Sequence, residues 1–426
     1  MSAPYYQDGP VTVFHGDCVE VMHSLPDGSV DAVVTDPPYG LEFMGKEWDR
    51  YTPADFEAWC AVWAAECLRV LKPGGHLLAF GGSRTWHRLA AGIEDAGFEV
   101  RDSIAWLYGS GFPKSLDVSK AIDKAAGVER DIPGRHARVE DRVVGVAGND
   151  GRCVTCGRQR GGQPGNCQCD KRGEPVTDAA REWQGWGTTL KPAFEPIVVA
   201  RKPLAKGHTV AANVLSYGTG ALNIDAARVG SESTARKNRA AIGYDEGMGV
   251  TARKKGAQYS TDSDAGRWPA NVVLDESQAA ALDQQPGGKS LNGSAVWKGG
   301  TRAHEGWGNV GKAEPGQVRG GFGDSGGASR FFYTAKADSA ERPNVDGVSH
   351  PTVKPLDLMQ WLVRLVTPPG GTVLEPFAGS GTTIEAAVLE NFTVIGIERE
   401  ADYLPLIMQR VRKPHTQSLF DLDGAA

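Results

Sequence analysis

Four consecutive residues, Asp36, Pro37, Pro38 and Tyr39, place a carboxylate, two rigid residues and an aromatic ring directly after an apolar run. Adjacent prolines fix the backbone, so the Asp36 carboxylate and the Pro37 carbonyl become preorganised acceptors. Each can accept one hydrogen of an exocyclic amine, which frees the nitrogen lone pair to attack an electrophilic methyl group. Tyr39 offers a ring on which a base can stack after leaving a duplex. The simpler interpretation is an Asp-Pro turn that ends a strand.

A second segment has the composition of a ligand-binding loop. It consists of Glu375, Pro376, Phe377, Ala378, Gly379, Ser380 and Gly381, followed by Thr382. If a strand precedes the loop and a helix follows it, the glycines let the backbone approach a ligand at the carboxyl edge of a sheet. Glu398 then ends the next strand, where a carboxylate typically binds ribose hydroxyls, and Glu375 is placed to receive an ammonium group.

The ligand of this loop is expected to be a nucleoside without phosphates. The segment lacks the Gly-Lys-Ser/Thr ending of a phosphate-binding loop, which disfavours ATP. S-adenosylmethionine meets the requirement. A Gly-x-Gly pair alone is weak evidence, and an ordinary turn is the alternative.

Four of the seven cysteines form a third candidate site. They are Cys153, Cys156, Cys167 and Cys169, in the pattern Cys-x2-Cys-x10-Cys-x-Cys. Four thiolates in paired spacing suit tetrahedral Zn²⁺, so we expect a structural zinc knuckle, with unliganded thiols as the alternative. The other three cysteines, Cys18, Cys60 and Cys67, occupy apolar helical positions and are expected to pack in the core.

Strand and helix patterns alternate around the first two segments. Extended patterns cover Val11–His15, Val30–Thr35, His76–Phe80, Phe98–Trp106, Gly371–Leu374 and Thr393–Ile397. Helical patterns cover Cys18–Leu25, Phe56–Leu71, Trp86–Ala96, Leu356–Val366, Thr382–Asn391 and Ala401–Val411. This alternation predicts βαβ units and a mostly parallel sheet of an α/β protein.

Together these motifs resemble the DNA amino-methyltransferases of the β arrangement, including phage-type members. In that family the Asp-Pro-Pro-Tyr segment comes first, a target-recognition region follows, and the Phe-x-Gly-x-Gly cofactor loop comes last. The same order is found here, with Asp36–Tyr39 before Phe377–Gly381. The resemblance covers about Thr12–Trp106 and His350–Arg412.

The resemblance implies further site residues. Asp17 and Cys18 correspond to the segment that contacts the adenine ring of the cofactor. His350, Thr352 and Lys354 belong to a segment that approaches the methionine part. The implied cofactor set also contains Asp36, the loop Glu375–Thr382 and Glu398.

The family order implies a Rossmann-like, doubly wound methyltransferase sheet that is circularly permuted. The chain would begin between the second and third strands of the usual order, so its ends should lie close together. We expect residues 1–108 and 350–413 to form the core and residues 414–426 a tail. The large irregular insertion, 109–349, would bind DNA and recognise the target, with the zinc knuckle at 153–169 and a core strand near 194–200.

Charge is distributed in agreement with this division. The whole chain carries a net charge of −6, but residues 109–349 contain 33 Lys and Arg against 27 Asp and Glu. The remainder contains 13 basic and 25 acidic residues. A basic middle suits a phosphate backbone.

Parts of the insertion allow two interpretations. Residues 287–327 contain 14 glycines with interspersed Trp, Lys and Arg, which fits either a flexible loop or a segment that orders on nucleic acid. Residues 195–203 predict a buried edge strand. Three residues precede or begin this strand: Lys191, Pro192 and Glu195. They either border the base pocket or only pack at the strand end. Residues 330–333 predict a strand returning to the core.

The sequence therefore predicts a site-specific enzyme that methylates N6 of adenine in double-stranded DNA, as in restriction-modification systems. Methylation of cytosine N4 is the closest alternative, and an inactive DNA-binding protein with this fold is an alternative of another class. No membrane span or secretory signal is recognisable, which predicts a cytoplasmic protein without a membrane partner. Oligomeric state is left open, with a homodimer as one alternative.

Overall fold

The computed structural model describes residues 3–42, 49–111, 115–130, 173–230, 266–284, 327–335 and 341–413. It also gives the backbone of two short paired strands, β8 (Ala295–Val296) and β9 (Val318–Arg319). The chain divides into two compact units. One comprises Met1–Gly109 with Phe194–Ala426, and the other comprises Ser110–Ala193.

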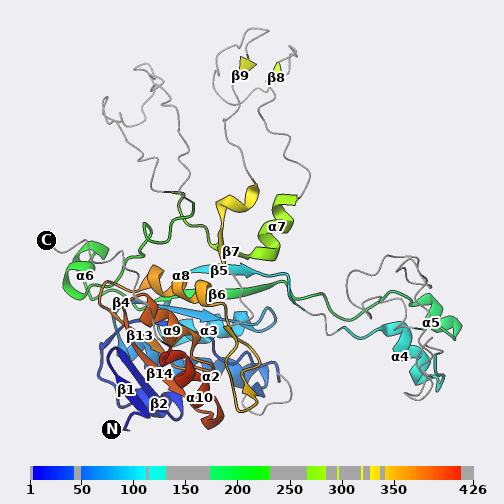
Figure 1. Ribbon diagram of the computed structural model, residues 1–426, viewed down its shortest axis with the longest axis horizontal. Helices are drawn as coiled ribbons and strands as arrows, with labels where there is room; N and C mark the ends of the chain where they lie inside the picture. Colours follow the sequence, from blue (N-terminus) through cyan, green and yellow to red (C-terminus); the bar gives the residue numbers. More distant parts are fainter. Residues whose placement is uncertain are drawn as a thin grey trace. The chain divides into compact units, whose positions relative to one another are not determined.

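A ten-stranded sheet organises the first unit (Figure 1). Its strands are β1 (Tyr6–Asp8), β2 (Val11–His15), β3 (Val30–Thr35), β4 (Leu71–Phe80), β5 (Glu99–Leu107), β6 (Phe194–Arg201), β7 (Val272–Asp275), β10 (Tyr333–Ala335), β13 (Thr372–Glu375) and β14 (Thr393–Glu398). Their spatial order is β1-β2-β14-β13-β3-β4-β6-β5-β7-β10.

Strand directions confirm the permuted arrangement. β2, β14, β13, β3 and β4 are mutually parallel, with β13 and β14 at the centre although they come last in the chain. β6 runs antiparallel to both β4 and β5. The late strands thus complete a sheet that the early strands begin.

Helices cover both faces of this sheet, as a doubly wound fold requires. They are α1 (Cys18–Met22), α2 (Pro53–Val70), α3 (Trp86–Asp95), α8 (Leu356–Val366), α9 (Thr382–Leu389) and α10 (Leu404–Val411). Two further helices of this unit, α6 (Val210–Tyr217) and α7 (Glu276–Gln284), bury one residue each, Asn213 and Ala279. Shorter elements are the 3₁₀ helices η5 (Ala328–Phe331) and η7 (Ala401–Tyr403), and the strands β11 (Asn344–Val345) and β12 (Val348–Ser349).

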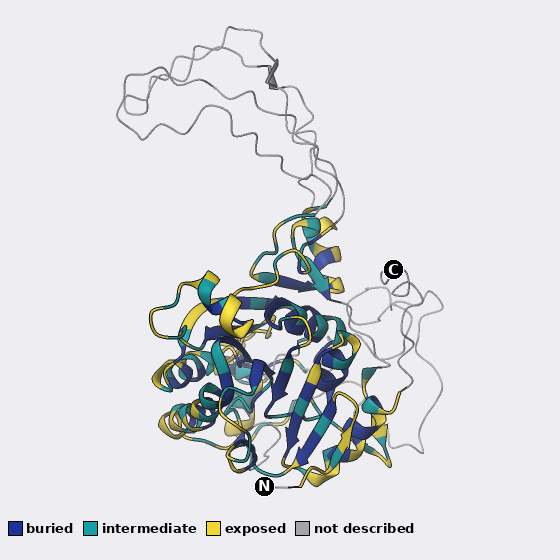
Figure 2. Ribbon diagram, turned by 90° about the vertical axis from the view of Figure 1, so that its left-hand side faces the viewer, coloured by how far each residue is buried: buried dark blue, intermediate teal, exposed yellow. Residues whose placement is uncertain are grey.

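Two apolar cores lie on opposite faces of the sheet. α1, α2 and α3 bury Met22, Trp63 and Ile93 on one face, and α8, α9 and α10 bury Trp361 and Ile407 on the other. All six residues of β3 are buried, which is typical of a parallel strand covered on both sides. Figure 2 shows the buried strands between helices with exposed outer faces. Cys18, Cys60 and Cys67 are buried free thiols of the first core, as expected.

The described ends of the chain lie close together. β1 pairs with β2, which in turn pairs with β14, and α10 follows β14 along the chain. Tyr6 and Arg412 are near enough for the guanidinium to influence the phenol. Proximity of the ends is what the permuted strand order predicts.

Two predictions about the insertion were wrong in detail. β6 is an internal strand between β4 and β5 rather than an edge strand, which explains why Pro196–Arg201 are all buried. The expected strand at 330–333 begins only at Tyr333. Its first half belongs to the 3₁₀ helix η5. The Ser329 amide and hydroxyl donate hydrogen bonds to the Asp283 carboxylate, and the Ser329 carbonyl accepts one from the Phe332 amide.

The second unit contains two described helices, α4 (Val118–Ala125) and α5 (Asp178–Glu182). Asp123 links them, because its carboxylate accepts hydrogen bonds from the Thr177 amide and hydroxyl, at 3.0 and 2.7 Å. Arg130 pairs with the same carboxylate at 2.6 Å. A buried polar cluster thus holds this small unit together.

Candidate active site

The predicted catalytic and cofactor segments share one edge of the sheet. Parallel strands bring their carboxyl ends to the same edge, and β14, β13 and β3 are neighbours there. Glu398 ends β14, Glu375 ends β13, and Asp36 directly follows β3. Segments more than 300 residues apart in sequence therefore form one site.

The tetrapeptide is held by contacts on both sides. Tyr39 donates its hydroxyl hydrogen toward Asp36 Oδ1, at 2.9 Å, and its backbone carbonyl accepts a hydrogen bond from Thr85 Oγ1 at 2.7 Å. The chain then turns at Gly40, whose φ of 65° favours glycine. Asp49 fixes this turn by accepting the Gly40 and Leu41 amides at 2.6 and 3.1 Å. Pro37 and Pro38 lie between these anchored ends.

Lys354 occupies the centre of the acidic cluster. Its ammonium lies 2.6 Å from Asp36 Oδ2 and 3.2 Å from both Tyr39 Oη and Glu195 Oε2. The Phe80 ring packs against it at 4.9 Å. Burial acts to lower the pKa of Lys354, but the Asp36 and Glu195 carboxylates outweigh burial and raise it. Lys354 therefore remains an ammonium in this site.

Burial and the same two carboxylates raise the pKa of Tyr39 well above its ordinary value. The phenol accordingly stays protonated at neutral pH. Its ring remains uncharged, and its hydroxyl remains a hydrogen-bond donor.

The glycine loop is tightly packed. Gly379 and Gly381 have φ of 52° and 83°. A Cβ at Gly379 would lie 3.1 Å from His350 Nε2, and one at Gly381 would lie 3.1 Å from the Ile407 backbone. Neither position accommodates a side chain without displacement. Thr382 begins α9 directly after the loop.

The other loop residues pack inward. Phe377 contacts the rings of Trp59 and Trp63, each with centroids 5.5 Å away. The Ala378 amide bonds to the Ile397 carbonyl at 2.8 Å, and Ser380 is buried. Pro376 is buried between Glu375 and Phe377. These contacts fix the conformation of the loop.

Glu375 is almost fully buried at the base of the loop. Its carboxylate accepts hydrogen bonds from the Thr35 and Thr383 hydroxyls and, at 3.0 Å, from the Phe377 amide. Burial raises its pKa to about 8, although the three hydrogen bonds act in the opposite direction. Glu375 is therefore largely protonated at neutral pH and poised to ionise beside a cation.

Glu398 connects the loop with β2. It accepts the Gly379 amide at 2.6 Å and the Glu400 amide at 2.7 Å, and burial raises its pKa to about 7. Its backbone carbonyl accepts the Gly16 amide at 3.0 Å. Asp17, which follows Gly16, caps α1 because its carboxylate accepts a hydrogen bond from the Val19 amide at 2.9 Å. Cys18 begins α1 and is buried, and burial raises the pKa of its thiol to about 12.

The His350 segment lies against the same loop. The His350 ring approaches Gly379 and packs edge-on against Tyr403, with centroids 4.6 Å apart. Its Nδ1 is 2.6 Å from the carbonyl of Thr352, whose side chain is exposed. Four residues after His350, Lys354 reaches Asp36. This segment therefore bridges the cofactor loop and the tetrapeptide.

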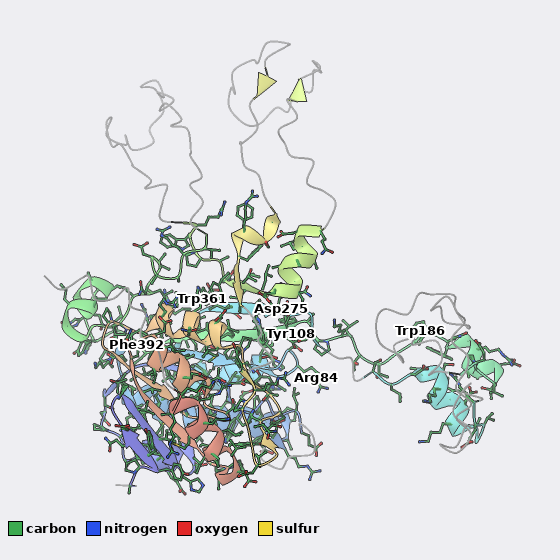
Figure 3. All side chains as sticks on the ribbon, viewed as in Figure 1. Arg84, Tyr108, Trp186, Asp275, Trp361 and Phe392 are labelled. Atoms are coloured by element: carbon green, nitrogen blue, oxygen red, sulfur yellow. The ribbon has the colours of Figure 1, made fainter. Side chains whose placement is uncertain are left out.

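Glu195 lies in the site, but the two residues predicted together with it to border the base pocket belong to the other unit. Lys191 and Pro192 are exposed residues of the Ser110–Ala193 unit. Sequence reasoning missed Tyr108 and Phe80, which surround Glu195 and Lys354. Tyr108 follows β5 on the ribbon in Figure 3, and burial together with Glu195 raises its pKa to about 12. An aromatic residue at a strand end was the available signal.

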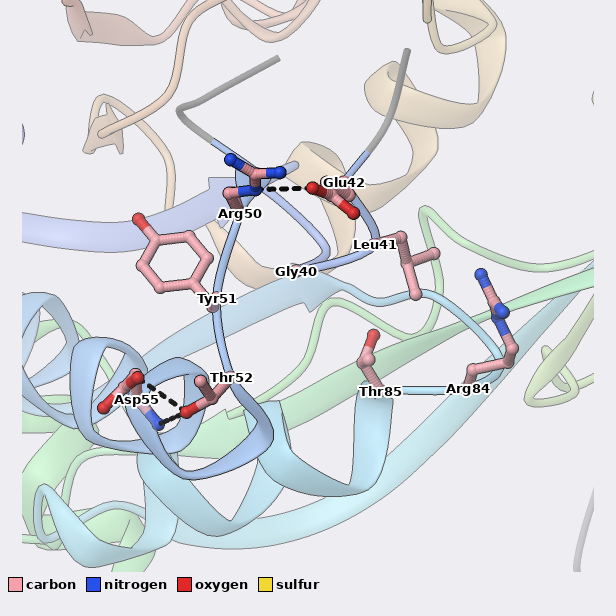
Figure 4. A pocket seen from close by; sticks show the side chains of 9 residues that line it. All are labelled: Gly40, Leu41, Glu42, Arg50, Tyr51, Thr52, Asp55, Arg84 and Thr85. Carbon is pink, nitrogen blue, oxygen red and sulfur yellow. Dashed lines mark hydrogen bonds and ion pairs between the residues drawn. The ribbon is translucent and has the colours of Figure 1, made fainter. Parts of the chain in front are cut away.

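A cavity of about 700 Å³ is lined in part by Gly40, the residue that follows Tyr39 in the chain (Figure 4). It is lined by Gly40, Leu41, Glu42, Arg50, Tyr51, Thr52, Asp55, Arg84 and Thr85. This volume is in the range of small-molecule pockets. The cavity thus provides space next to the tetrapeptide.

The four predicted zinc ligands, Cys153, Cys156, Cys167 and Cys169, lie outside the described residues. Within the described ranges, no cluster of His, Cys, Asp or Glu could hold a metal ion. No described helix is long and apolar enough to cross a membrane.

A protein-family model described as DNA methylase, of the N6/N4 methyltransferase type, matches residues 30–409. The chain belongs to this family. The match confirms the family that the order of the motifs predicted, and it includes both halves of the permuted core.

Two curated relatives show limited identity to this chain. The type II methyltransferase M.HindIII of Haemophilus influenzae is 23% identical over 247 residues, which are 50% of this chain and 64% of that protein. M.HinfI of the same species is 26% identical over 110 residues, 22% of this chain and 31% of that protein. The chain thus covers less than two thirds of either relative.

Solved structures are also similar. PvuII DNA methyltransferase, described as cytosine-N4-specific, has a TM-score of 0.44 and 14% identity, covering 97% of this chain and 90% of that one. The M1.HpyAVI complex with SAM has a TM-score of 0.39 and 16% identity, with coverage of 94% and 99%.

Proposed function

We propose that this DNA methylase transfers the methyl group of S-adenosylmethionine to N6 of adenine in double-stranded DNA. The observation that carries the proposal is the placement of Asp36 at the same sheet edge as the glycine loop and Glu398. An acceptor for an amine and a binding site for a nucleoside are thereby adjacent.

The residues present fit S-adenosylmethionine. Gly379 and Gly381 pack so closely against His350 and Ile407 that a side chain at either position would displace the loop, and two buried carboxylates, Glu375 and Glu398, flank it. Glu375 would hold the ammonium group and Glu398 the ribose hydroxyls, because a carboxylate that accepts two or three hydrogen bonds retains further acceptor sites. Asp17, Cys18, His350 and Thr352 complete the proposed site. When bound, the cofactor supplies a methyl group on a positively charged sulfur.

The tetrapeptide acts on the other reactant. Asp36 and the Pro37 carbonyl each accept one hydrogen of the target amine, which makes its lone pair available. In the present structure Lys354 and Tyr39 each engage one oxygen of Asp36. An entering amine must therefore share Asp36 with Lys354 or take its place. Tyr39 presents its ring to the flipped base.

Adenine is proposed over cytosine because the family resemblance associates the Asp form of the tetrapeptide with adenine. The N4 amine of cytosine has the same two hydrogens, so the same acceptors can serve it. Analysis of the methylated nucleoside distinguishes these two substrates.

DNA binding is assigned to the region between residues 109 and 349. Two arginines of this region lie over exposed aromatic rings, Arg228 at 5.5 Å from the Trp268 centroid and Arg267 at 5.0 Å from the Phe331 centroid. Trp268 is 66% exposed. Cations beside exposed rings suit phosphates and unstacked bases, which supports the assignment.

The proposal is tested by two measurements on the purified full-length chain. Calorimetry should show that S-adenosylmethionine binds, and labelled cofactor should transfer its methyl group to unmethylated double-stranded DNA. Binding without transfer to any DNA would refute the enzyme assignment. Absence of cofactor binding would favour the inactive DNA-binding protein.

A further inference from the structure

Glu195 reaches the catalytic edge because β6 runs against its neighbours. β6 is antiparallel to β4, so its first residues lie where β4 ends, with Phe80 opposite Ile197. The Gly81 amide bonds to the Pro196 carbonyl at 2.9 Å and fixes this junction. Glu195 thus comes from a strand that carries neither the tetrapeptide, nor the glycine loop, nor the His350 segment.

Three neighbours surround the Glu195 carboxylate. Oε2 lies 2.9 Å from Tyr39 Oη and 3.2 Å from Lys354 Nζ, and Tyr108 lies close enough for its phenol to respond to the carboxylate. The Glu195 side chain is 19% exposed, whereas Lys354 is 8% exposed. Glu195 is therefore oriented by the catalytic tetrapeptide rather than by solvent.

The Tyr39 hydroxyl lies between the carboxylates of Asp36 and Glu195. Its single hydroxyl oxygen lies 2.9 Å from both Asp36 Oδ1 and Glu195 Oε2. A hydroxyl has one hydrogen to donate, so it can serve only one carboxylate at a time. Lys354 stabilises the arrangement because its ammonium contacts both acids.

The formal charges of Asp36, Glu195 and Lys354 indicate what this cluster does in methyl transfer. Asp36 paired with Lys354 alone would be neutral, and Glu195 supplies the excess negative charge. Transfer breaks the bond between methyl carbon and sulfur, whose electron pair stays on sulfur, while the amine lone pair forms the new bond. Positive charge therefore moves onto the amine nitrogen until one of its hydrogens leaves as a proton, to Asp36 and then to water. Net negative charge nearby stabilises that change.

We propose that Glu195 is a positioning and charge-balancing residue of methyl transfer, which orients Tyr39 and offsets the ammonium of Lys354. This inference rests on the proposed function. It predicts that the balance of charge between Glu195 and Lys354, and not only their presence, sets the transfer rate.

Four proteins test the inference: the wild type, Glu195→Gln, Lys354→Met and the double variant. Single-turnover transfer to DNA is measured at saturating cofactor. Glu195→Gln should slow transfer about tenfold or more, because it removes the negative charge that lies 2.9 Å from the Tyr39 hydroxyl and 3.2 Å from the Lys354 ammonium. The double variant again has one net negative charge and should be faster than Glu195→Gln. Glu99→Gln removes a carboxylate of β5 that pairs with Arg201 at the far end of β6, so it is the matched control and should keep the wild-type rate.

A second readout needs no turnover. Denaturant unfolding of the same four proteins, without cofactor, should show that the double variant loses less stability than the two single variants together. Cofactor affinity should stay within about twofold of the wild type in Glu195→Gln, a difference of less than about 0.5 kcal/mol.

The inference is overturned by a wild-type transfer rate in Glu195→Gln, by a double variant slower than Glu195→Gln, or by additive stability losses. A wild type that transfers no methyl group to DNA instead refutes the proposed function and the catalytic part of the inference with it. In that case the unfolding measurements would still test the contact between Glu195 and Lys354. Additive losses of stability in the two single variants would show that the two side chains do not interact.

Discussion

The ammonium of Lys354 lies 2.6 Å from Asp36 Oδ2, although 318 positions separate the two residues in the chain. The contact joins the segment that carries His350 to the tetrapeptide after β3. It shows that the late and early parts of the permuted chain form one site. It also means that the proposed amine acceptor is occupied by a cation before substrate enters.

Asp36→Asn should abolish methyl transfer, with a loss of at least about 100-fold, comparable to the removal of a preorganised electrostatic contact. The amide retains one oxygen acceptor but loses the charge that stabilises the developing cation. Cofactor affinity should change little, because Glu375, Glu398 and the glycine loop remain. Single-turnover transfer and calorimetry measure the two effects separately. Full activity in this variant would remove the role assigned to Asp36.

The contribution of Glu375 to the stability of the protein should fall as pH rises from about 5 to 8. The pKa of Glu375 is raised from 4.5 to about 8, so the folded state keeps a proton that the unfolded state loses in this range. Its contribution is fully present below pH 4.5 and is lost as pH rises through 8, at about 1.4 kcal/mol per pH unit. Glu398, with a pKa of about 7, contributes in the same direction.

Denaturant unfolding of the wild type and Glu375→Gln at several pH values measures this effect. The variant cannot ionise, so the free energy of unfolding should fall less steeply with pH than in the wild type. Equal slopes for the two proteins would show that Glu375 ionises normally in the folded state.

Gly381→Ala should weaken cofactor binding at least about tenfold, which corresponds to about 1.4 kcal/mol. The substituted residue must adopt a φ of 83°, and its Cβ would lie 3.1 Å from the Ile407 backbone, so the loop has to shift. Gly347→Ala is the matched control, because Gly347 has a φ of 84° but nothing within 4 Å. Equal cofactor affinity in the two variants would argue against close packing of the loop as the cause.

The cysteine cluster should bind zinc. Elemental analysis of the purified protein should find about one zinc per chain if four thiolates form one tetrahedral site. Cys153→Ser combined with Cys156→Ser should remove the metal and leave the methyltransferase core folded. A folded wild-type protein free of metal would exclude the knuckle.

The sequence predicted the core of the fold well because its strands and helices carry strong local patterns. Val30–Thr35 is a fully buried parallel strand, and Leu356–Val366 is an amphipathic helix with the predicted bounds. The motif order also determined which strands had to be neighbours. The predicted cofactor loop and tetrapeptide meet at one edge for that reason.

Other features depended on long-range packing that local patterns do not encode. The internal position of β6 follows from pairing with β4 and β5, which a run of apolar residues cannot distinguish from an edge. Glu195 enters the site only through that pairing. Lys354 was expected near the cofactor, but its partners Asp36 and Glu195 come from two other segments.

The identity of the methylated nucleoside tests the central claim most directly. Unmethylated double-stranded DNA is incubated with S-adenosylmethionine and either the wild type or Asp36→Asn, digested to nucleosides and analysed by mass spectrometry with authentic standards. We predict N6-methyldeoxyadenosine with the wild type and none with Asp36→Asn. N4-methyldeoxycytidine would retain the amine chemistry but contradict the choice of adenine. The absence of any methylated nucleoside, or its formation by Asp36→Asn at the wild-type rate, would contradict the account itself.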